Sequence, residues 1–326
     1  MSTILYLRAM VKLFLGNRTG VLFLIPFFML GYFLLDQFTS YYPHNAQTNI
    51  GMWGISIPFS DSFLEISGAI LVVMNALAIN MIYNANEFLE RNSYMPSLLY
   101  VVMMSFYHAA YSIDGLLVAH SFVIAMIYQL FLLRQNEDGR RHVFNAAFLA
   151  GCATTFHPPL VLLSPLLIIM ARRIRPFVFR EALMVIVGMG IPLVYAGVYL
   201  WMSGSKIELK LIDKSIDYTN KQTDFLITAV LFTLLFLLSL VSIRSRMKTS
   251  SIRLKKLTSM LWWLVLLGAI FGIADFFMFG QIERFSFLMI PLSFFLPFAF
   301  TSQTFGRLAS FLFYITFGYS CLKFFL

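Results

Sequence analysis

Ionisable side chains stand at the ends of several long apolar stretches of this sequence, where they could take part in chemistry. Such groups are costly to place near hydrocarbon, so each is a candidate functional residue unless its side chain reaches water. The candidates are Asp36, Asp61, Glu65, Asp114, His157, Asp275, Glu283 and Arg284. The alternative for each of them is a harmless charge at a helix end.

Three of the carboxylates border one polar segment. Asp36 directly follows an apolar stretch and precedes residues rich in hydrogen-bonding side chains, where it could act as a general base toward a hydroxyl group. Asp61 and Glu65 are four residues apart, on one face of a helix, and could share a proton or bind a divalent cation together with Asp36. We take Asp36 and Asp61 as the candidate catalytic residues. Apart from this cation, the sequence indicates no cofactor.

Other candidates could hold an anionic substrate. The Arg284 guanidinium could grip a phosphate with two hydrogen bonds, or it could pair with Glu283 or Asp275. His157 precedes two prolines and could bind phosphate or relay a proton. Lys206 and Lys210 alternate with apolar residues and could attract a lipid phosphate, unless they form a solvated amphipathic helix. The candidate substrate-binding residues are therefore Arg284, Glu283, His157, Asp114, Lys206 and Lys210.

The elements that carry these residues are apolar enough to cross a membrane. Of the 326 residues, 60% are hydrophobic and 12% are charged, a balance unlike that of soluble domains. A helix that spans a bilayer needs about 20 apolar residues, fewer if its neighbours bury it. We predict about eleven membrane-spanning helices, near residues 19–35, 63–83, 95–110, 115–133, 143–156, 159–171, 182–202, 224–243, 258–275, 285–301 and 308–325. The sequence thus predicts an all-α, polytopic integral membrane protein with a single transmembrane domain over residues 1–326.

Lysines and arginines cluster in alternate gaps between the apolar stretches. The clusters fall near residues 8–18, 134–141, 172–180 and 244–256. Basic residues favour the cytoplasmic side, so we predict a cytoplasmic N-terminus. Residues 1–18 then form a cytoplasmic interfacial helix, 36–62 a first outer loop, 203–223 an outer lysine-rich loop and 244–257 a basic cytoplasmic loop. This orientation puts the candidate residues on the outer face.

The stretch from 143 to 171 contains Pro158 and Pro159 at its centre and is basic at both ends. Proline removes a backbone donor, and a single crossing would place the two basic ends on opposite sides of the membrane. We therefore predict a short helical hairpin whose tip, Thr155 to Pro159, points to the outer face and is sheltered by protein.

Several classes of function are excluded. The chain has no GxxxxGK[ST] loop, GxSxG elbow or paired CxxC motif, which argues against an ATP-driven pump. Topology accounts for the net charge of +9, so no nucleic-acid partner is expected. Cys152 and Cys321 lie in apolar stretches, where a thiol behaves as a small hydrophobic group, and we predict neither a disulfide nor a metal site from them.

The order of these parts resembles the membrane core of C-type glycosyltransferases, which take sugars from polyprenyl-phosphate donors. The resemblance is carried by ERNSYMP (Glu90, Arg91, Pro96), the turn YSIDG, the broken hairpin and ERFSFLMIPLSFFLPFAF. It implies a catalytic aspartate in the first outer loop, which corresponds to Asp36 or, less well, to Asp61. The chain lacks the paired acidic motif and the large outer domain of those enzymes.

The chain also resembles a family of polytopic inner-membrane proteins from Bacteroidota-type bacteria. Here the shared pattern is NRxG (Asn17, Arg18, Gly20), the FNAAFLxG hairpin, RPFxxRE (Arg175 to Glu181) and a following GxxxP. This second resemblance covers most of the chain and implies a multi-pass protein of the bacterial inner membrane.

Together these features predict a glycosyltransferase-like enzyme that acts on a lipid-linked sugar at the outer, periplasmic face. Its expected partners are a lipid-linked sugar or lipid phosphate and the membrane lipids. One alternative is a non-catalytic subunit of an envelope or secretion complex, which the missing acidic motif favours. The other is a lipid or polymer transporter, or flippase, which would require broken helices in corresponding halves.

Overall fold

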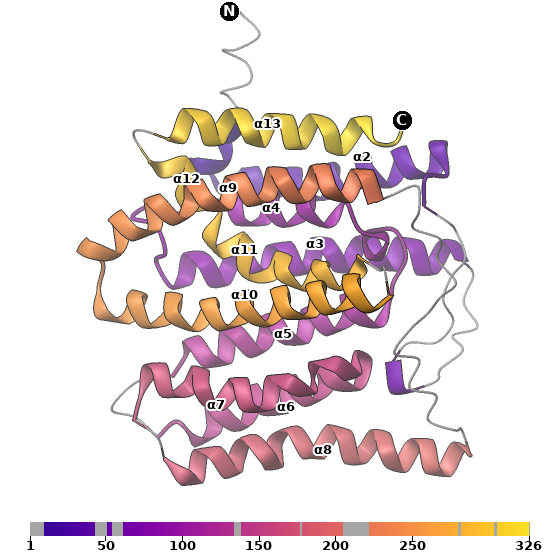
Figure 1. Cartoon of the computed structure of the whole chain (residues 1–326), viewed down its shortest axis with the longest axis vertical. Coiled ribbons are helices and arrows are strands. Elements are labelled where there is room, and N and C mark those ends of the chain that lie inside the picture. Colours follow the sequence, from indigo (N-terminus) through magenta and orange to yellow (C-terminus); the bar gives the residue numbers. More distant parts are fainter. Residues whose placement is uncertain are drawn as a thin grey trace, which may run out of the picture.

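The computed structural model describes residues 10–42, 51–53, 61–133, 138–176, 178–204, 222–279, 282–302 and 305–325. In these parts of the chain every regular element is helical, which confirms the all-α prediction. Six of the described helices are long and apolar enough to cross a membrane, so the chain is a multi-pass membrane protein. Figure 1 shows the long helices lying roughly parallel to one another.

The α-helices in the first half of the bundle are 10 to 25 residues long. Its elements are η1 (Thr19–Phe23), α2 (Leu24–Thr39), η2 (Gly51–Trp53), α3 (Asp61–Ala85), α4 (Met95–Met104), η3 (His108–Ala110), α5 (Gly115–Phe131), α6 (Arg140–Phe156), η4 (Pro158–Leu162) and α7 (Leu163–Ile174). Residues 10–15 are also helical, within the predicted interfacial helix.

The second half contains the longest helices. Its elements are α8 (Phe179–Ser203), α9 (Gln222–Thr249), α10 (Ile252–Phe279), η6 (Glu283–Leu288), α11 (Met289–Phe295), α12 (Pro297–Thr301) and α13 (Gly306–Leu322). Most of the predicted outer segment 203–223 lies outside the described residues.

The basic cytoplasmic loop predicted at 244–257 is wrong in extent, because α9 and α10 continue through it and leave only Ser250 and Ser251 between them. Lysine and arginine are good helix formers, and cations near the carboxyl end of a helix interact favourably with its dipole. The Ser251 hydroxyl accepts the Leu254 N–H at 3.3 Å and caps the start of α10.

The proline pair breaks the 143–171 stretch as predicted. α6 ends at Phe156, His157 is extended, and α7 begins at Leu163 after η4. The tip lies against η2, where Gly51 has a φ of +64°, and a Cβ atom on Gly51 would lie 2.5 Å from the Thr155 carbonyl oxygen. Glycine at position 51 therefore permits both the turn and the close contact.

Glycines also let α6 and α8 approach closely. A Cβ atom on Gly151 would lie 2.7 Å from the Met189 carbonyl oxygen, whereas one on Gly190 would meet no atom within 4 Å. We expect Gly151→Ala to lower the free energy of unfolding by about 1–3 kcal/mol, since the helices must separate. Gly190→Ala is the control and should be neutral or stabilising by about 0.5–1 kcal/mol. Thermal unfolding in detergent tests both, and equal effects would contradict the packing argument.

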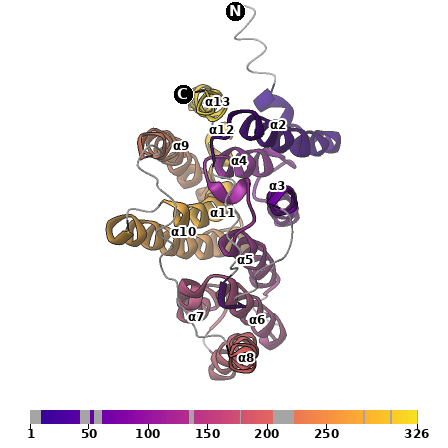
Figure 2. The same ribbon diagram turned by 90° about the vertical axis from the view of Figure 1, so that its right-hand side faces the viewer.

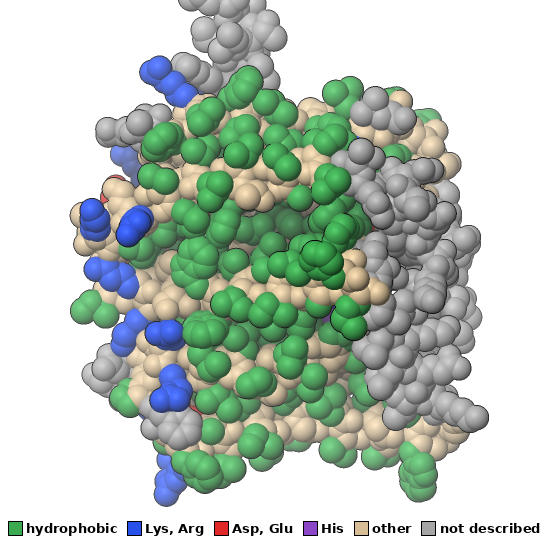
Figure 3. All heavy atoms as spheres, in the orientation of Figure 1, with side chains coloured by type: hydrophobic (Ala, Val, Ile, Leu, Met, Phe, Trp, Pro, Cys, Tyr) green, Lys and Arg blue, Asp and Glu red, His purple; other side chains and the backbone are tan. Residues whose placement is uncertain are grey.

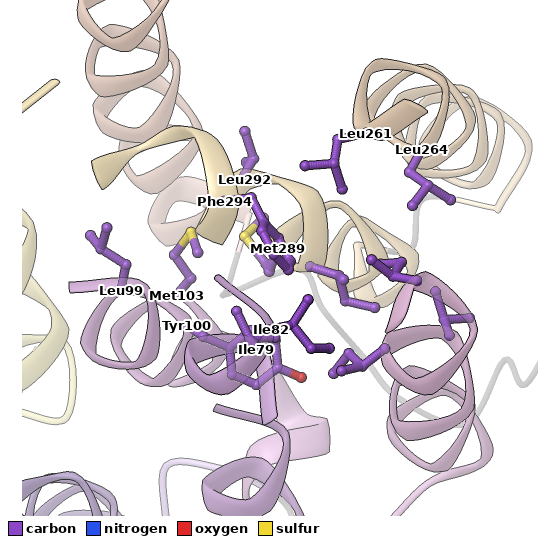
Figure 4. Close-up of a cluster of buried hydrophobic side chains, with 14 of the residues drawn as sticks. Ile79, Ile82, Leu99, Tyr100, Met103, Leu261, Leu264, Met289, Leu292 and Phe294 are labelled. Carbon is purple, nitrogen blue, oxygen red and sulfur yellow. The ribbon is translucent and has the colours of Figure 1, made fainter. Parts of the chain in front are cut away.

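The segment from Glu283 to Thr301 lies at the centre of the bundle. Most of it is buried, unlike the other long apolar segments, and it consists of the short helices η6, α11 and α12, the last beginning at Pro297. Figure 2 shows α11 between α10 and α4. Phe294 and Met289 of α11 pack there with aliphatic and aromatic side chains of α3, α4 and α10 (Figure 4). This central segment fixes the positions of the helices around it.

The two ends of the bundle differ in the charge of their side chains. The basic end carries the starts of α6, α8, α10 and α13 and the ends of α7 and α9, and Figure 3 shows its Lys and Arg side chains along one edge. The opposite, acidic end carries Asp36, Asp114, Asp224, Asp275 and Glu283. All candidate residues that the structure describes lie at the acidic end.

Candidate functional site

A cavity of about 330 Å³ lies between α9 and α10. A two-residue connection joins these helices at the basic end, but they diverge from there, with η6 and α11 forming the floor between them (Figure 2). The molecular surface is hollowed between hydrophobic side chains of the two helices (Figure 3). The volume falls at the lower end of the roughly 300–1,000 Å³ that is usual for ligand sites.

Most of the cavity wall is apolar. The walls include Ala229, Phe232 and Phe236 of α9, Val265 and Ala269 of α10, and Leu292 of α11. Because both lateral walls are membrane-spanning helices, the gap between them faces the hydrocarbon of a bilayer. A lipid chain is therefore the kind of group that these walls fit best.

Three charged side chains line one end of the cavity, which we call the polar end. Asp224 comes from the first turn of α9, Glu283 from the start of η6, and Lys323 follows the last turn of α13. Tyr41 and Tyr42, from the residues after α2, complete it. Elements far apart in the sequence thus bring two carboxylates and an ammonium group to the edge of an apolar space.

Lys323 is buried, with 1% of its surface exposed. Its ammonium group donates to the Tyr42 hydroxyl at 3.2 Å and to the Ser105 carbonyl oxygen. Five aromatic rings surround it, with ring centroids 4.7–5.6 Å from Nζ: those of Tyr41, Tyr42, Phe106, Tyr111 and Phe324. Ring faces attract a desolvated cation, and a cation also suits the carboxyl end of α13. Lys323 is thus held in one place beside the cavity.

The two cavity carboxylates have different partners. Both oxygens of Asp224 accept tyrosine hydroxyls, one from Tyr41 and one from Tyr319. Glu283 accepts the His108 N–H through Oε1 at 3.2 Å. This backbone donor orients one oxygen of Glu283, whereas both oxygens of Asp224 are occupied, so Glu283 is the better-placed proton acceptor.

Asp36, the first candidate base, lies beside this cluster and does not line the cavity. It was expected to open a loop, but α2 continues to Thr39 and places Asp36 in its last turn with 2% exposure. Its carboxylate accepts the Tyr42 N–H at 3.0 Å. The Tyr42 ring stacks on Tyr111 with centroids 4.6 Å apart. Asp36 therefore positions a side chain of the cavity wall.

Arg284 follows Glu283 in η6 but is absent from the cavity lining. Its guanidinium is 2.9 Å from the carboxylate of Asp275, which is 1% exposed. Burial and the Arg284 charge lower the pKa of His157 to about 3, so this imidazole is neutral at pH 7 and offers hydrogen bonds without charge. The structure thus separates the predicted phosphate ligands Arg284 and His157 from the cavity.

The remaining candidates fall into two groups. Asp114 caps α5 by accepting the Leu117 N–H at 2.6 Å, and burial raises its pKa to about 6. Glu65 accepts a hydrogen bond from Gln37 at 2.7 Å. Asp61 begins α3, but its side chain lies outside the described part, as do Lys206 and Lys210. Among the described residues no three His, Cys, Asp or Glu side chains come together as a metal site.

Sequence reasoning missed Lys323 and Asp224. Both were counted as parts of apolar spans, 308–325 and 224–243. The rule that an ionisable residue within a membrane span is a functional candidate applies to Lys323 and could have identified it. Asp224 resembles an ordinary helix-start carboxylate, and only its two tyrosine partners distinguish it.

The arrangement can bind an amphipathic molecule, with its chain between α9 and α10 and its polar group beside a proton acceptor and a cation. No protein-family model matches the chain, and no curated protein or solved structure matches it either. The functional argument therefore depends on this geometry.

Proposed function

We propose that the protein is a multi-pass inner-membrane enzyme of the glycosyltransferase type, which transfers a sugar from a lipid-linked donor at the outer face. The observation that carries this proposal is the polar end, where Glu283 and Lys323 border an apolar cavity between two membrane-spanning helices. Sugar transfer from a lipid phosphate needs these features: a place for the chain, a base and a cation.

Each group has a role in this reaction. The Glu283 carboxylate takes the proton of the acceptor hydroxyl, whose oxygen bonds to the sugar carbon as the carbon–oxygen bond to the lipid phosphate breaks. Lys323 offsets the charge on the departing phosphate. Asp36 holds Tyr42, and the lipid chain occupies the space between α9 and α10. Lys206 and Lys210 keep their proposed role of attracting the donor phosphate.

The proposed orientation follows from charge. The basic end faces the cytoplasm, so the polar end of the cavity opens toward the outer face. We retain about eleven crossings, in which the shorter helices α4, α5, α6, α7 and α13 cross within the shelter of longer ones. The C-type membrane core is part of the same proposal.

One observation favours a second candidate, a lipid transporter. Besides the hairpin at Pro158, the central segment is also broken, at Leu296 before Pro297. Two interrupted segments are a feature of secondary transporters, which bind substrate at such breaks. Movement of a labelled lipid across the bilayer without any sugar transfer would favour this candidate.

A pair of alanines on α10 tests the cavity. Ala269 lines it, whereas Ala274 is exposed on the bilayer side. We expect Ala269→Phe to lower binding of an added polyprenyl phosphate in nanodiscs by about tenfold or more, because the ring occupies the space of the chain. Native mass spectrometry measures the bound lipid, and Ala274→Phe is the matched control. Equal binding by both variants would place the lipid elsewhere and remove the support for the proposed function.

A further inference from the structure

Two tyrosines bind one carboxylate at the polar end. Asp224 accepts the hydroxyl of Tyr41, which follows α2, and the hydroxyl of Tyr319, which lies on α13. Burial and the Asp224 carboxylate raise the pKa of Tyr41, so the Tyr41 hydroxyl stays protonated and acts as the hydrogen-bond donor. Hydrogen bonds from hydroxyl groups to a carboxylate are among the stronger ones in proteins.

Both tyrosines are held in place independently of Asp224. The Tyr41 ring meets the Phe324 ring edge-on with centroids 5.5 Å apart. The Tyr319 ring stacks on Phe106 with centroids 6.3 Å apart. The two tyrosine hydroxyls therefore stay in place, and Asp224, in the first turn of α9, is the group that can move away from them.

The attachment of α9 differs between its two ends. Toward the basic end α9 packs on α12, and Ser250 and Ser251 join it to α10. At the acidic end Phe225 packs against Phe276 and Phe285, which are apolar contacts on the α10 side. On the side of α2 and α13, the described directional contacts of Asp224 are the two tyrosine hydrogen bonds. Losing them would leave α9 with only its packing against α13 on this side, and would let the turn at Asp224 move away from the tyrosines.

We propose that Asp224, Tyr41 and Tyr319 form a latch that closes the polar end of the cavity and controls access to Glu283 from the outer aqueous side. Tyr41, Asp224 and Glu283 all line the cavity, so a shift of α9 at Asp224 opens its wall beside Glu283. The lateral gap between α9 and α10 is separate from this latch and remains the route for a lipid chain. The inference rests on the proposed function, since it takes the cavity as the substrate site and makes the latch its regulator.

Cysteine accessibility tests the latch without a substrate. Cys152 and Cys321 are replaced by alanine, and Ala229→Cys places a single thiol on the cavity wall five residues after Asp224. The protein is reconstituted in liposomes, and a charged, membrane-impermeant methanethiosulfonate reagent is added on the side of the acidic end. The Tyr41→Phe/Tyr319→Phe variant removes both hydroxyls and keeps both rings. We expect it to raise the rate of thiol modification by about tenfold or more, since two hydrogen bonds to a charged group are lost.

Tyr314→Phe is the matched control. It lies on α13 as well, but its hydroxyl accepts the Val11 N–H at 3.1 Å and takes no part in the latch. A rate in the double variant equal to that of Tyr314→Phe would overturn the proposal. The single variant Tyr319→Phe keeps the test valid if the double variant unfolds, and it should give an intermediate rate. Faster modification without any polyprenyl phosphate binding would support the latch and contradict the proposed function.

Discussion

Glu283→Gln should lower the rate of sugar transfer by roughly 10²–10⁴-fold, which is the usual contribution of a general base. The amide cannot take the proton of the acceptor hydroxyl. Its oxygen can still accept the His108 N–H, which Glu283 binds at 3.2 Å, so the fold around η6 should be retained. Transfer of a labelled sugar from a polyprenyl-phosphate donor measures the rate, and native mass spectrometry should show unchanged lipid binding.

The matched control is Glu65→Gln. Glu65 is a carboxylate near the same end of the bundle, but it accepts a hydrogen bond from Gln37 and does not line the cavity. Its replacement should leave transfer within about twofold of the wild type, since the amide oxygen can still accept from Gln37 and the side chain does not reach the cavity. Full activity of Glu283→Gln together with loss of activity in Asp36→Asn would return the role of base to Asp36.

The helical architecture was well predicted from the sequence because the hydrocarbon core of a bilayer requires it. A run of apolar residues in a bilayer must satisfy its own backbone groups, and a helix does so locally. The break at Pro158 was equally predictable, since proline lacks the donor that a continuous helix needs. Helix ends were less predictable: α9 continues past Arg244 to Thr249 because arginine and lysine side chains reach water while the backbone stays helical.

The site was only partly predictable, because its geometry depends on contacts between distant elements. The sequence identified Glu283 but could not tell that it and Arg284, adjacent in η6, face different surroundings. Asp36 was recognised as an unusual carboxylate, yet one more turn of α2 placed it behind Tyr42. Lys323 depends on five rings from three parts of the chain, and of these only Phe324 belongs to the local sequence around it.

Arg284→Met should lower the free energy of unfolding by about 3–5 kcal/mol, the usual cost of leaving one partner of a buried ion pair without the other. Asp275 is 1% exposed and 2.9 Å from the Arg284 guanidinium, so its charge would lose this compensation inside the bundle. Thermal unfolding in detergent measures the change. A loss below about 1 kcal/mol would show that water or another cation compensates Asp275, and that the pair contributes little to the fold.

The double variant Asp275→Leu/Arg284→Met separates a structural role from substrate binding. Replacing both charges by apolar side chains of similar size removes the buried carboxylate as well, so stability should return to within about 1–2 kcal/mol of the wild type. If Arg284 is structural, this variant also keeps its binding of polyprenyl phosphate, because Arg284 does not line the cavity. If the double variant is stable but binds the lipid phosphate at least about tenfold more weakly, Arg284 holds the phosphate as the sequence first indicated, and the role proposed for Lys323 is wrong.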